Sequence, residues 1–210
     1  MNDVTKKFAN LYTSGNYLSG TNNTWDIEDS PWKAKNIFQI IKKNELRPKS
    51  IAEVGCGAGV ILSELSDREY FNNCKFSGFD ISPQAIELSE KIKKDNCQFF
   101  CEDIFKKEKE QNHWDVLLVI DVFEHVPDYM GFVEKCRNIS DYQIYHIPLD
   151  IHVSSVLRNK FTLNRNSLVS PGSGGLGHLH YFTADSALAT LEDTGHKIID
   201  SFYTSGGIDL

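Results

Sequence analysis

The sequence predicts an α/β fold, a doubly wound and mostly parallel sheet with helices on both faces. First, a short apolar segment ends in glycines at alternate positions, in the run Ile51-Ala52-Glu53-Val54-Gly55-Cys56-Gly57-Ala58-Gly59, and an amphipathic segment follows it. Second, strand-like and helix-like segments alternate along the chain. Third, acidic residues follow three of the predicted strands, at Asp80, Asp103 and Asp121. Together these observations indicate a ligand site at the carboxyl edge of a parallel sheet.

Composition is that of a globular protein, with 210 residues, 40% of them hydrophobic and 24% charged. The formal net charge of −7 argues against general nucleic-acid binding, which requires a basic surface. We expect a soluble, cytoplasmic protein without a membrane partner, because no long apolar run or signal peptide occurs. The five cysteines form no C-x-x-C pair and predict neither a zinc site nor a disulfide framework.

Residues 1–45 are expected to form an N-terminal arm and a helix that act as a lid. The first part of the arm carries scattered aromatic rings without sustained periodicity, so it is either a lid or a cover for the edge of the sheet. A helix is predicted from Ser30-Pro31 to about Asn44, because proline favours the first turn and apolar residues follow at helical spacing.

Residues 46–210 are expected to form the sheet domain, and its first half is regular. A strand over 50–54 leads through the glycines into a helix that ends near Ser66. A strand over 75–79 follows, and the next helix begins at Ser82-Pro83, where serine is an N-cap and proline occupies the first turn. The third strand is predicted over 97–101.

The second half of the domain is less regular. The uninterrupted apolar run over 114–120 predicts a central strand buried on both sides. A helix over 129–139 leads to a strand over 142–147. Residues 150–180 are rich in Ser, Asn, Gly and Pro and predict a loop-rich insertion. Thr183 caps a predicted helix over 184–192, and 196–203 is predicted to form the last strand.

The glycine run alone leaves the type of cofactor open. A dinucleotide fingerprint, G-x-G-x-x-G, would place a third glycine where this chain has Val60. This departure counts against a nicotinamide cofactor. Asp80, at the end of the second strand, lies where an acidic side chain accepts hydrogen bonds from both hydroxyls of a ribose. The pattern therefore favours a nucleoside cofactor other than a dinucleotide.

As a set, these segments resemble the class I S-adenosylmethionine-dependent methyltransferases, specifically the small-molecule branch. The matching pieces are 53–59, 78–82, 102–104, 121–126 and 177–183. The resemblance covers residues 50–203 and implies a Rossmann-like fold with S-adenosylmethionine as the cofactor. It also implies a seventh, antiparallel strand, so either the chain is truncated after Leu210 or its sheet lacks that strand.

The resemblance assigns roles around the methionine part of the cofactor. Glu53 would lie near its ammonium group, and Asp121 and Val122 would border the sulfonium. The methionine part would contact the backbone of Gly55, Gly57 and Gly59.

Roles at the nucleoside end follow from the same resemblance. Asp80 would bind the ribose and Ile81 would pack on the adenine. Asp103 and the backbone of Ile104 would contact the amino edge of the adenine. Each of these acids taken alone is equally consistent with a solvated strand end.

Methyl transfer from a sulfonium is an in-line displacement, so orientation and exclusion of water supply most of the rate. A single base suffices to take the proton of the acceptor. His125, just after the fourth strand, is one candidate, since an unperturbed imidazole has a pKa of about 6.5. The alternative is a loop histidine that braces the strand. His146, at the end of the fifth strand, is the second catalytic candidate.

Substrate-binding candidates lie after the fifth strand: Asp150, Arg158, His178, His180 and Tyr181. On an extended chain, His178 and His180 would face the same side. Three interpretations stay open for these histidines: a polar acceptor pocket, a divalent metal site shared with Asp150, or a structural role. We assign no residue as a metal ligand.

The charge of this region predicts an anionic acceptor. Asp150 is the only acid between His146 and Tyr181, and Arg158, Lys160 and Arg165 lie in the same stretch. Arginine suits phosphate or carboxylate, so a phosphorylated or nucleotide-linked sugar is one such acceptor, while a solvated loop with ordinary charges is the alternative. Residues 121–124 also lack the Asn-Pro-Pro-aromatic motif of methylases that act on amino groups of bases, which disfavours a nucleic-acid acceptor.

The sequence thus predicts methyl transfer from S-adenosylmethionine to an oxygen or nitrogen of a small molecule. Segments 30–34 and 145–150 resemble bacterial methyltransferases of cell-surface polysaccharide pathways. Two alternatives stay open: a nicotinamide-dependent oxidoreductase on a Rossmann fold, and a non-catalytic regulator that binds S-adenosylmethionine. The oligomeric state is not predicted.

Overall fold

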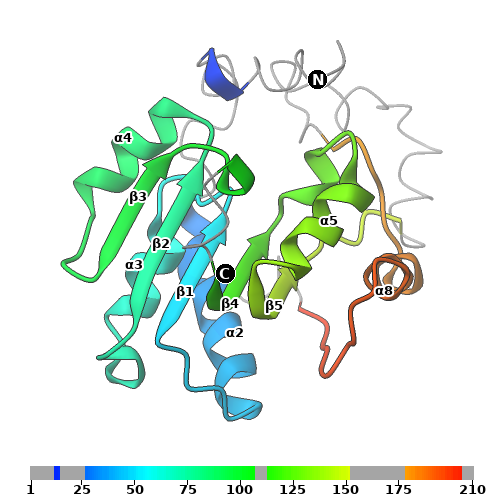
Figure 1. Cartoon of the computed structure of the whole chain (residues 1–210), viewed down its shortest axis with the longest axis horizontal. Coiled ribbons are helices and arrows are strands. Elements are labelled where there is room, and N and C mark those ends of the chain that lie inside the picture. The colour runs from blue at the N-terminus through cyan, green and yellow to red at the C-terminus, as the bar shows by residue number, and fades with distance from the viewer. Residues whose placement is uncertain (1–11, 15–26, 107–112, 152–177, 205–210) are drawn as a thin grey trace.

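The computed structural model describes residues 12–14, 27–106, 113–151 and 178–204. In these residues a single sheet has the strand order β3-β2-β1-β4-β5, and all its pairings are parallel (Figure 1). The strands are β1 Ser50–Val54, β2 Lys75–Asp80, β3 Cys97–Cys101, β4 Trp114–Ile120 and β5 Ser140–His146. The predicted doubly wound sheet is therefore confirmed. Most of the predicted arm and most of the insertion over 150–180 lie outside the described residues.

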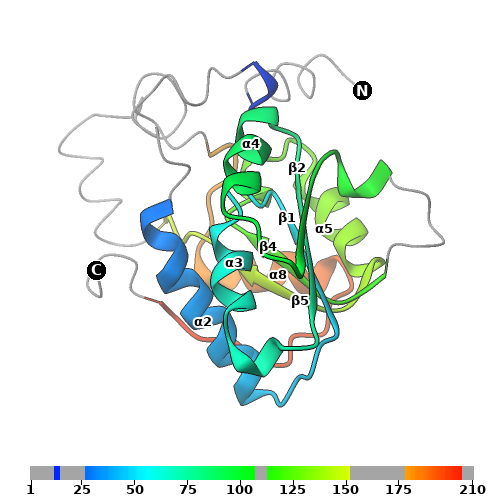
Figure 2. The same cartoon turned by 90° about the vertical axis from the view of Figure 1, so that its left-hand side faces the viewer.

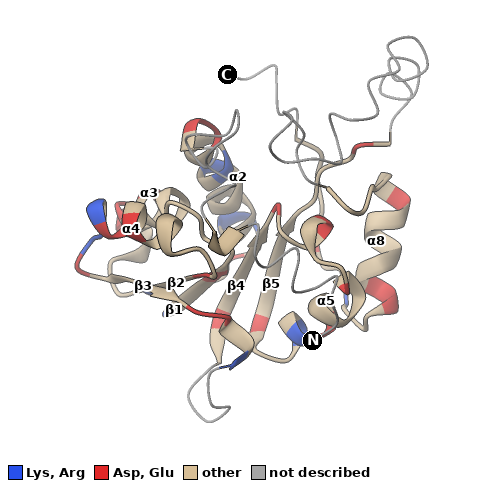
Figure 3. Ribbon diagram, turned by 90° about the horizontal axis from the view of Figure 1, so that it is seen from above, with Lys and Arg blue, Asp and Glu red and all other residues tan. Residues whose placement is uncertain are grey.

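Helices cover both faces of the sheet. Figure 2 and Figure 3 show one group on one face and a second group on the other. The first group is α2 Ser30–Lys43, α3 Val60–Ser66 and α4 Pro83–Lys91. The second group is α5 Tyr129–Arg137 and α8 Ala184–Asp193. None of the helices in the described part of the chain is both long and apolar enough to cross a bilayer.

Side chains of the central strands alternate between two hydrophobic cores. Leu118 packs in the core beneath α2 and α3, and its neighbour Leu117 packs in the core beneath α5 and α8. Both side chains are fully buried. Because successive strand residues point to opposite faces, a strand covered on both sides needs apolar residues throughout, as β4 has.

Helix starts follow the predicted capping. The Ser82 hydroxyl accepts a hydrogen bond from the Ala85 N–H at the start of α4. Thr183 and Ser186 form a reciprocal capping box at the start of α8. These caps satisfy N–H groups that a helix leaves unpaired in its first turn, so they fix where each helix begins after its loop.

Two predicted boundaries differ from the structure by two residues, and several others differ by one. α5 ends at Arg137 rather than at 139, and β5 begins at Ser140, two residues earlier than predicted. Asp141 and Tyr142 at the start of β5 are exposed. A strand at the edge of a sheet tolerates polar residues, so hydropathy did not reveal where this strand begins.

The prediction of a last strand over 196–203 is wrong. These residues form no strand. Ile198 packs against the core beneath α5 and α8, but Ile199, Phe202 and Tyr203 are 59%, 46% and 78% exposed. Side-chain contacts join the segment to the end of α2. The Asp200 carboxylate accepts hydrogen bonds from Lys43 Nζ and Asn44 Nδ2, both at 2.8 Å. Within the described residues, β5 is therefore an edge strand.

Candidate active site

The glycine loop after β1 is shaped by left-handed backbone conformations. Gly55, Gly57 and Gly59 have φ angles of 69°, 53° and 75°. The N–H of Gly55 donates to the Phe79 carbonyl at 2.7 Å, which ties the loop to the end of β2. A Cβ at Gly55 would lie 2.7 Å from Val122 Cγ2, so the loop after β4 leaves no room for a side chain there. The predicted glycine loop thus lies against Val122 and β2.

Asp80, at the end of β2, joins the glycine loop to the start of α4 through its carboxylate. Its Oδ2 accepts a hydrogen bond from Gly57 N–H at 3.0 Å, and its Oδ1 accepts one from Ser82 N–H at 2.8 Å. Burial raises the pKa of Asp80, and these backbone donors oppose that rise. An ionised carboxylate has about four lone-pair sites, so Asp80 retains capacity for ribose hydroxyls. The neighbouring Ile81 side chain is 40% exposed and offers an apolar surface beside it.

Asp103 lies at the end of the adjacent strand β3. Its Oδ1 accepts a hydrogen bond from Phe105 N–H at 3.1 Å, which orders the short 3₁₀ turn Ile104–Lys106. The Ile104 side chain is buried in the core beneath α5 and α8. The buried side chain leaves the backbone as the part of Ile104 that could meet a ligand, and its predicted contact with adenine stays a prediction.

Glu53 is a buried acid on β1 whose surroundings fit a cationic ligand. Its side chain is 2% exposed, and its Oε2 has no hydrogen-bond partner in the part of the chain that the structure describes. Burial raises the pKa of Glu53 well above its usual value, and the nearby Lys33 charge opposes the rise. Leaving a buried acceptor unpaired is unfavourable, so an ammonium group reaching Oε2 would stabilise the site. The amino group of S-adenosylmethionine has this chemistry.

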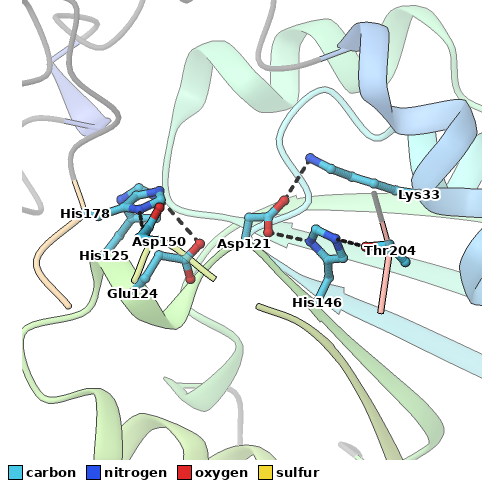
Figure 4. Close-up of polar contacts among 8 residues, drawn as sticks. All are labelled: Lys33, Asp121, Glu124, His125, His146, Asp150, His178 and Thr204. Carbon is cyan, nitrogen blue, oxygen red and sulfur yellow. Dashed lines mark hydrogen bonds and ion pairs between the residues drawn. The ribbon is translucent and has the colours of Figure 1, made fainter. Parts of the chain in front are cut away.

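Asp121 links α2 and β5 at the end of β4. Its Oδ2 pairs with Lys33 Nζ at 2.8 Å, and its Oδ1 pairs with His146 Nδ1 at 2.6 Å (Figure 4). Burial favours a higher pKa for Asp121, but the hydrogen bond and charge of His146 and the charge of Lys33 outweigh it and lower the pKa to about 2. Asp121 also has a φ of 54°, which is unusual outside glycine. The contacts with Lys33 and His146 tie this residue to α2 and β5.

A second polar cluster lies just after β4. In Figure 4 it stands on the opposite side of Asp121 from Lys33 and His146. Glu124 is fully buried, and neither of its carboxylate oxygens has a hydrogen-bond partner among the described residues. Its Oε1 lies 3.9 Å from His125 Nε2. The His178 ring stands edge-on to His125 with centroids 4.9 Å apart, and His178 Nδ1 lies 2.7 Å from Asp150 Oδ2. Burial raises the pKa of Glu124 well above its usual value, with the charge of Asp121 adding to the rise.

This cluster has the side chains of a metal site. Ligand atoms of Glu124, His125 and His178 all lie within 4.8 Å of one another. A carboxylate with two imidazoles suits several divalent ions. Sequence reasoning assigned no metal ligand and missed both Glu124 and Lys33. Glu124 lies directly between the predicted residues Asp121 and His125, but an acid after a strand carries no signal of complete burial. Lys33 lies in a helix expected only to form part of a lid.

The other predicted substrate residues make different contacts. His180 Nε2 lies 2.9 Å from the Val126 carbonyl oxygen, and its ring packs on Tyr129 with centroids 4.3 Å apart. The Tyr181 hydroxyl donates to the His178 carbonyl at 3.1 Å. Arg158 lies outside the described residues. The structure thus brings His178 and Asp150 to His125 and leaves His180 bound to a neighbouring loop.

A groove of about 1240 Å³ connects the two polar clusters. Its lining includes Asp121 and His146 from one cluster and His125 and His178 from the other. Trp32 of α2 also lines the groove, and its ring lies edge-on to His146 with centroids 5.9 Å apart. The groove can therefore place one small molecule in reach of both histidine-bearing clusters.

Comparison with known proteins gives a family match and several partial sequence relatives. The matching family model is described as a methyltransferase domain and covers residues 47–167. The ubiquinone biosynthesis O-methyltransferase of Coxiella burnetii is 26% identical over 110 residues, which are 51% of this chain and 44% of the relative. The chain therefore matches less than half the length of this relative.

Solved structures share the fold at low sequence identity. The methyltransferase domain of bacterial CtHen1-CN is 16% identical with a TM-score of 0.56, and the match covers 82% of this chain and 88% of that chain. The plantazolicin methyltransferase BpumL, solved with a monoazolic desmethylPZN analog and SAH, is 18% identical with a TM-score of 0.49. That match covers 78% of this chain and 64% of that chain. The likeness to the CtHen1 domain supports the Rossmann-like methyltransferase fold.

Proposed function

Because the chain belongs to the methyltransferase domain family, we propose that it transfers a methyl group from S-adenosylmethionine to an oxygen of a small molecule. The observation that carries the cofactor is Glu53, whose buried Oε2 has no partner among the described residues and lies on the strand that leads into the glycine loop. S-adenosylmethionine supplies the methyl group and a sulfide leaving group. The residues of this chain bind and orient the two reactants and take up the proton that the acceptor loses.

An oxygen acceptor is favoured over nitrogen by the curated relative. The Coxiella burnetii protein is named as an O-methyltransferase, and the matched residues are about half of this chain. A hydroxyl must lose its proton during methyl transfer, so an oxygen acceptor also gives a role to the histidines that line the groove. An anionic acceptor, a lid role for residues 1–45 and a polysaccharide pathway stay predictions.

We propose His146 as the base that takes the acceptor's proton. Asp121, ionised because of its lowered pKa, accepts a hydrogen bond from Nδ1–H of His146, so the lone pair of the imidazole is on Nε2. Such a carboxylate also stabilises the imidazolium that forms when Nε2 takes the proton. His125, the other histidine considered as a base from the sequence, lies in the second cluster, where Tyr12 is edge-on to it with ring centroids 6.4 Å apart.

The second cluster favours a divalent cation as a further participant. Glu124, His125 and His178 would hold it, and the cation would be a close positive partner for the buried Glu124 carboxylate, whose oxygens have no hydrogen-bond partner among the described residues. A bound cation would lower the pKa of an acceptor hydroxyl that it contacts. The cation and the His146 base are separable, because they lie in different clusters (Figure 4).

Cofactor binding is tested by thermal shift and calorimetry with S-adenosylhomocysteine, with NAD as the comparison. We expect S-adenosylhomocysteine to stabilise the protein and NAD to have no effect. Glu53→Gln should weaken S-adenosylhomocysteine binding about 10–100-fold, because a hydrogen bond to a charged group contributes about 1.5–3 kcal/mol. Glu87→Gln is the matched control, since the Glu87 side chain is 74% exposed on α4. Stabilisation by NAD alone would favour the oxidoreductase alternative.

Catalysis is tested by following S-adenosylhomocysteine release with small phenols, catechols and sugar phosphates as acceptors. His146→Ala should lower kcat by about 10²–10⁴-fold without a matching loss of cofactor affinity, as expected for a general base. Unchanged turnover in His146→Ala would rule out this base. Cofactor binding without turnover of any acceptor would favour a non-catalytic regulator.

A further inference from the structure

We propose that Asp150 is a positioning residue that fixes the His178 ring for a divalent cation shared with Glu124 and His125. This inference rests on the cation site of the proposed function and adds the residue that prepares it. The starting observation is the 2.7 Å contact between Asp150 Oδ2 and His178 Nδ1. Both side chains are largely buried, at 14% and 7% exposed.

The backbones of the segments that carry these residues are held independently of the contact. The N–H groups of Leu179 and His180 both donate to the Glu124 carbonyl, at 2.8 and 3.1 Å. The Ile151 N–H donates to the Phe182 carbonyl at 3.1 Å, which ties the chain beside Asp150 to the chain beyond His178. With its main chain fixed beside Glu124, His178 keeps freedom only in its ring. The Asp150 contact removes that freedom.

The contact also selects which ring nitrogen binds a ligand. An ionised carboxylate only accepts hydrogen bonds, so Nδ1 of His178 must carry the proton. The remaining nitrogen, Nε2, then has the lone pair that an ion requires. Histidine ligands in metal sites commonly donate their other N–H to a carboxylate in this manner, which raises their basicity and fixes the ring.

Burial and charge distinguish this cluster from an ordinary histidine–aspartate pair. The pair His113–Asp141 has the same 2.7 Å separation, but both of its side chains are 58% exposed. Beside His178, in contrast, stands the fully buried Glu124 carboxylate, which has no hydrogen-bond partner in the described part of the chain. A cation beside Glu124 would offset the unfavourable burial of that carboxylate. The surface pair offers no comparable group.

The experiment compares Asp150→Ala and Asp150→Asn with Asp141→Asn, the matched change in the surface pair. The tautomer of His178 is measured by long-range ¹H–¹⁵N NMR in the metal-free protein. Affinity for Co²⁺ and Mn²⁺ is measured by absorption spectroscopy and calorimetry on the same samples. We expect the wild-type His178 to carry its proton on Nδ1. Asp150→Ala should lose this preference and bind both ions about 10–100-fold more weakly, the usual effect of removing such a partner.

Asp141→Asn should bind both ions as the wild type does. If Asp150→Ala unfolds, Asp150→Asn, which keeps the size of the side chain, decides the question. Wild-type affinity and an unchanged tautomer in the Asp150 variants would overturn this inference while leaving the cation site intact. Failure of the wild-type protein to bind either ion would instead remove the cation site, and with it the role of Asp150. The methyl-transfer proposal would still be judged separately by S-adenosylhomocysteine binding.

Discussion

At the scale of single residues, the site depends on buried acids with carboxylate oxygens that have no hydrogen-bond partner among the described residues. Glu53 and Glu124 are 2% and 0% exposed, and each has at least one such oxygen. Burying an ionised carboxylate is unfavourable unless it is paired, so each residue lowers the stability of the ligand-free fold. Natural proteins keep such groups where a ligand completes them. Because their burial is unfavourable, replacing either acid should change the stability of the ligand-free protein measurably.

We expect Glu124→Gln to stabilise the ligand-free protein at neutral and alkaline pH. The pKa of Glu124 is raised in the folded protein. Below the unfolded pKa of about 4.3, Glu124 is therefore protonated in both the folded and the unfolded state, and its ionisation does not affect the free energy of unfolding. As pH rises above that value, the unfolded state ionises more readily, and the fold loses stability. The Tm difference between Glu124→Gln and wild type should therefore grow from pH 4 to pH 8.

A gain of about 1 kcal/mol corresponds to about 2–4 °C in Tm for a chain of this size. The measurement is differential scanning fluorimetry across pH, with Glu134→Gln on α5 as the control for charge removal alone. A Tm difference that is constant with pH would contradict the burial argument. Activity should fall in Glu124→Gln at every pH, because the proposed cation would lose a ligand.

At this scale the sequence predicted which residues belong to the site, but it did not predict their burial or their partners. Asp80, Asp103 and Asp121 were singled out because each follows a strand, and the structure places all three at the carboxyl edge of the sheet. Nothing in the sequence showed that Asp121 would be paired with Lys33, because that contact joins residues far apart in the chain. The burial of Glu124 was equally hidden, since it depends on a segment near His178.

At the scale of elements, the site depends on two loops at the ends of the central strands. The glycine loop after β1 and the loop after β4 meet where Gly55 faces Val122. Strands β1 and β4 are direct neighbours with Val54 opposite Val119, so their following loops are brought together by the sheet. The sequence predicted each loop separately. Their contact followed from strand order, which local patterns do not encode.

We expect Gly55→Ala to weaken cofactor binding at least tenfold and to lower the Tm. Alanine in a left-handed conformation costs about 1–2 kcal/mol, and its Cβ would also collide with Val122 Cγ2. Adding Val122→Ala should restore part of the affinity, because it removes the collision but leaves the backbone strain. A double-mutant cycle with S-adenosylhomocysteine affinity as the readout measures this coupling.

Gly195→Ala is the control for backbone strain. Gly195 also has a positive φ, of 83°, and its added Cβ would meet the flexible end of Arg137. This variant should lose stability without losing affinity for S-adenosylhomocysteine. Additive effects of Gly55→Ala and Val122→Ala would show that the two loops do not shape the site together.

At the scale of the whole molecule, the fold class was predictable because alternating strands and helices leave few arrangements for a parallel sheet. All five strands of the described sheet were predicted, and errors appeared at its edge. The strand predicted over 196–203 was wrong, because most apolar residues of that segment are exposed rather than buried in a further layer. The relation of α2 to the sheet was also not foreseen. Ala34 and Ile41 are fully buried, so α2 belongs to the core as well as to the site.

Helix α2 connects the active site to the opposite end of the molecule, and this provides a final test. Lys33 pairs with Asp121 at 2.8 Å beside the glycine loop, and Lys43 pairs with Asp200 at the same distance on the far end of the helix. The Lys33 side chain is 13% exposed and that of Lys43 is 65% exposed. Exposed pairs contribute little, so Lys43→Met should change neither affinity nor Tm appreciably.

Lys33→Met should weaken S-adenosylhomocysteine binding about tenfold at neutral pH. Without Lys33, Asp121 loses its link to α2, and the pKa of Glu53 rises further because the opposing cation is gone. A larger fraction of Glu53 is then protonated and unable to pair with the cofactor's ammonium. Affinity should therefore fall more steeply in Lys33→Met than in the wild type as pH is lowered from 8 to 6, and Lys33→Arg should bind nearly as wild type. The measurement is calorimetry across this pH range. Equal losses of affinity in Lys33→Met and Lys43→Met would mean that α2 acts only as a structural layer.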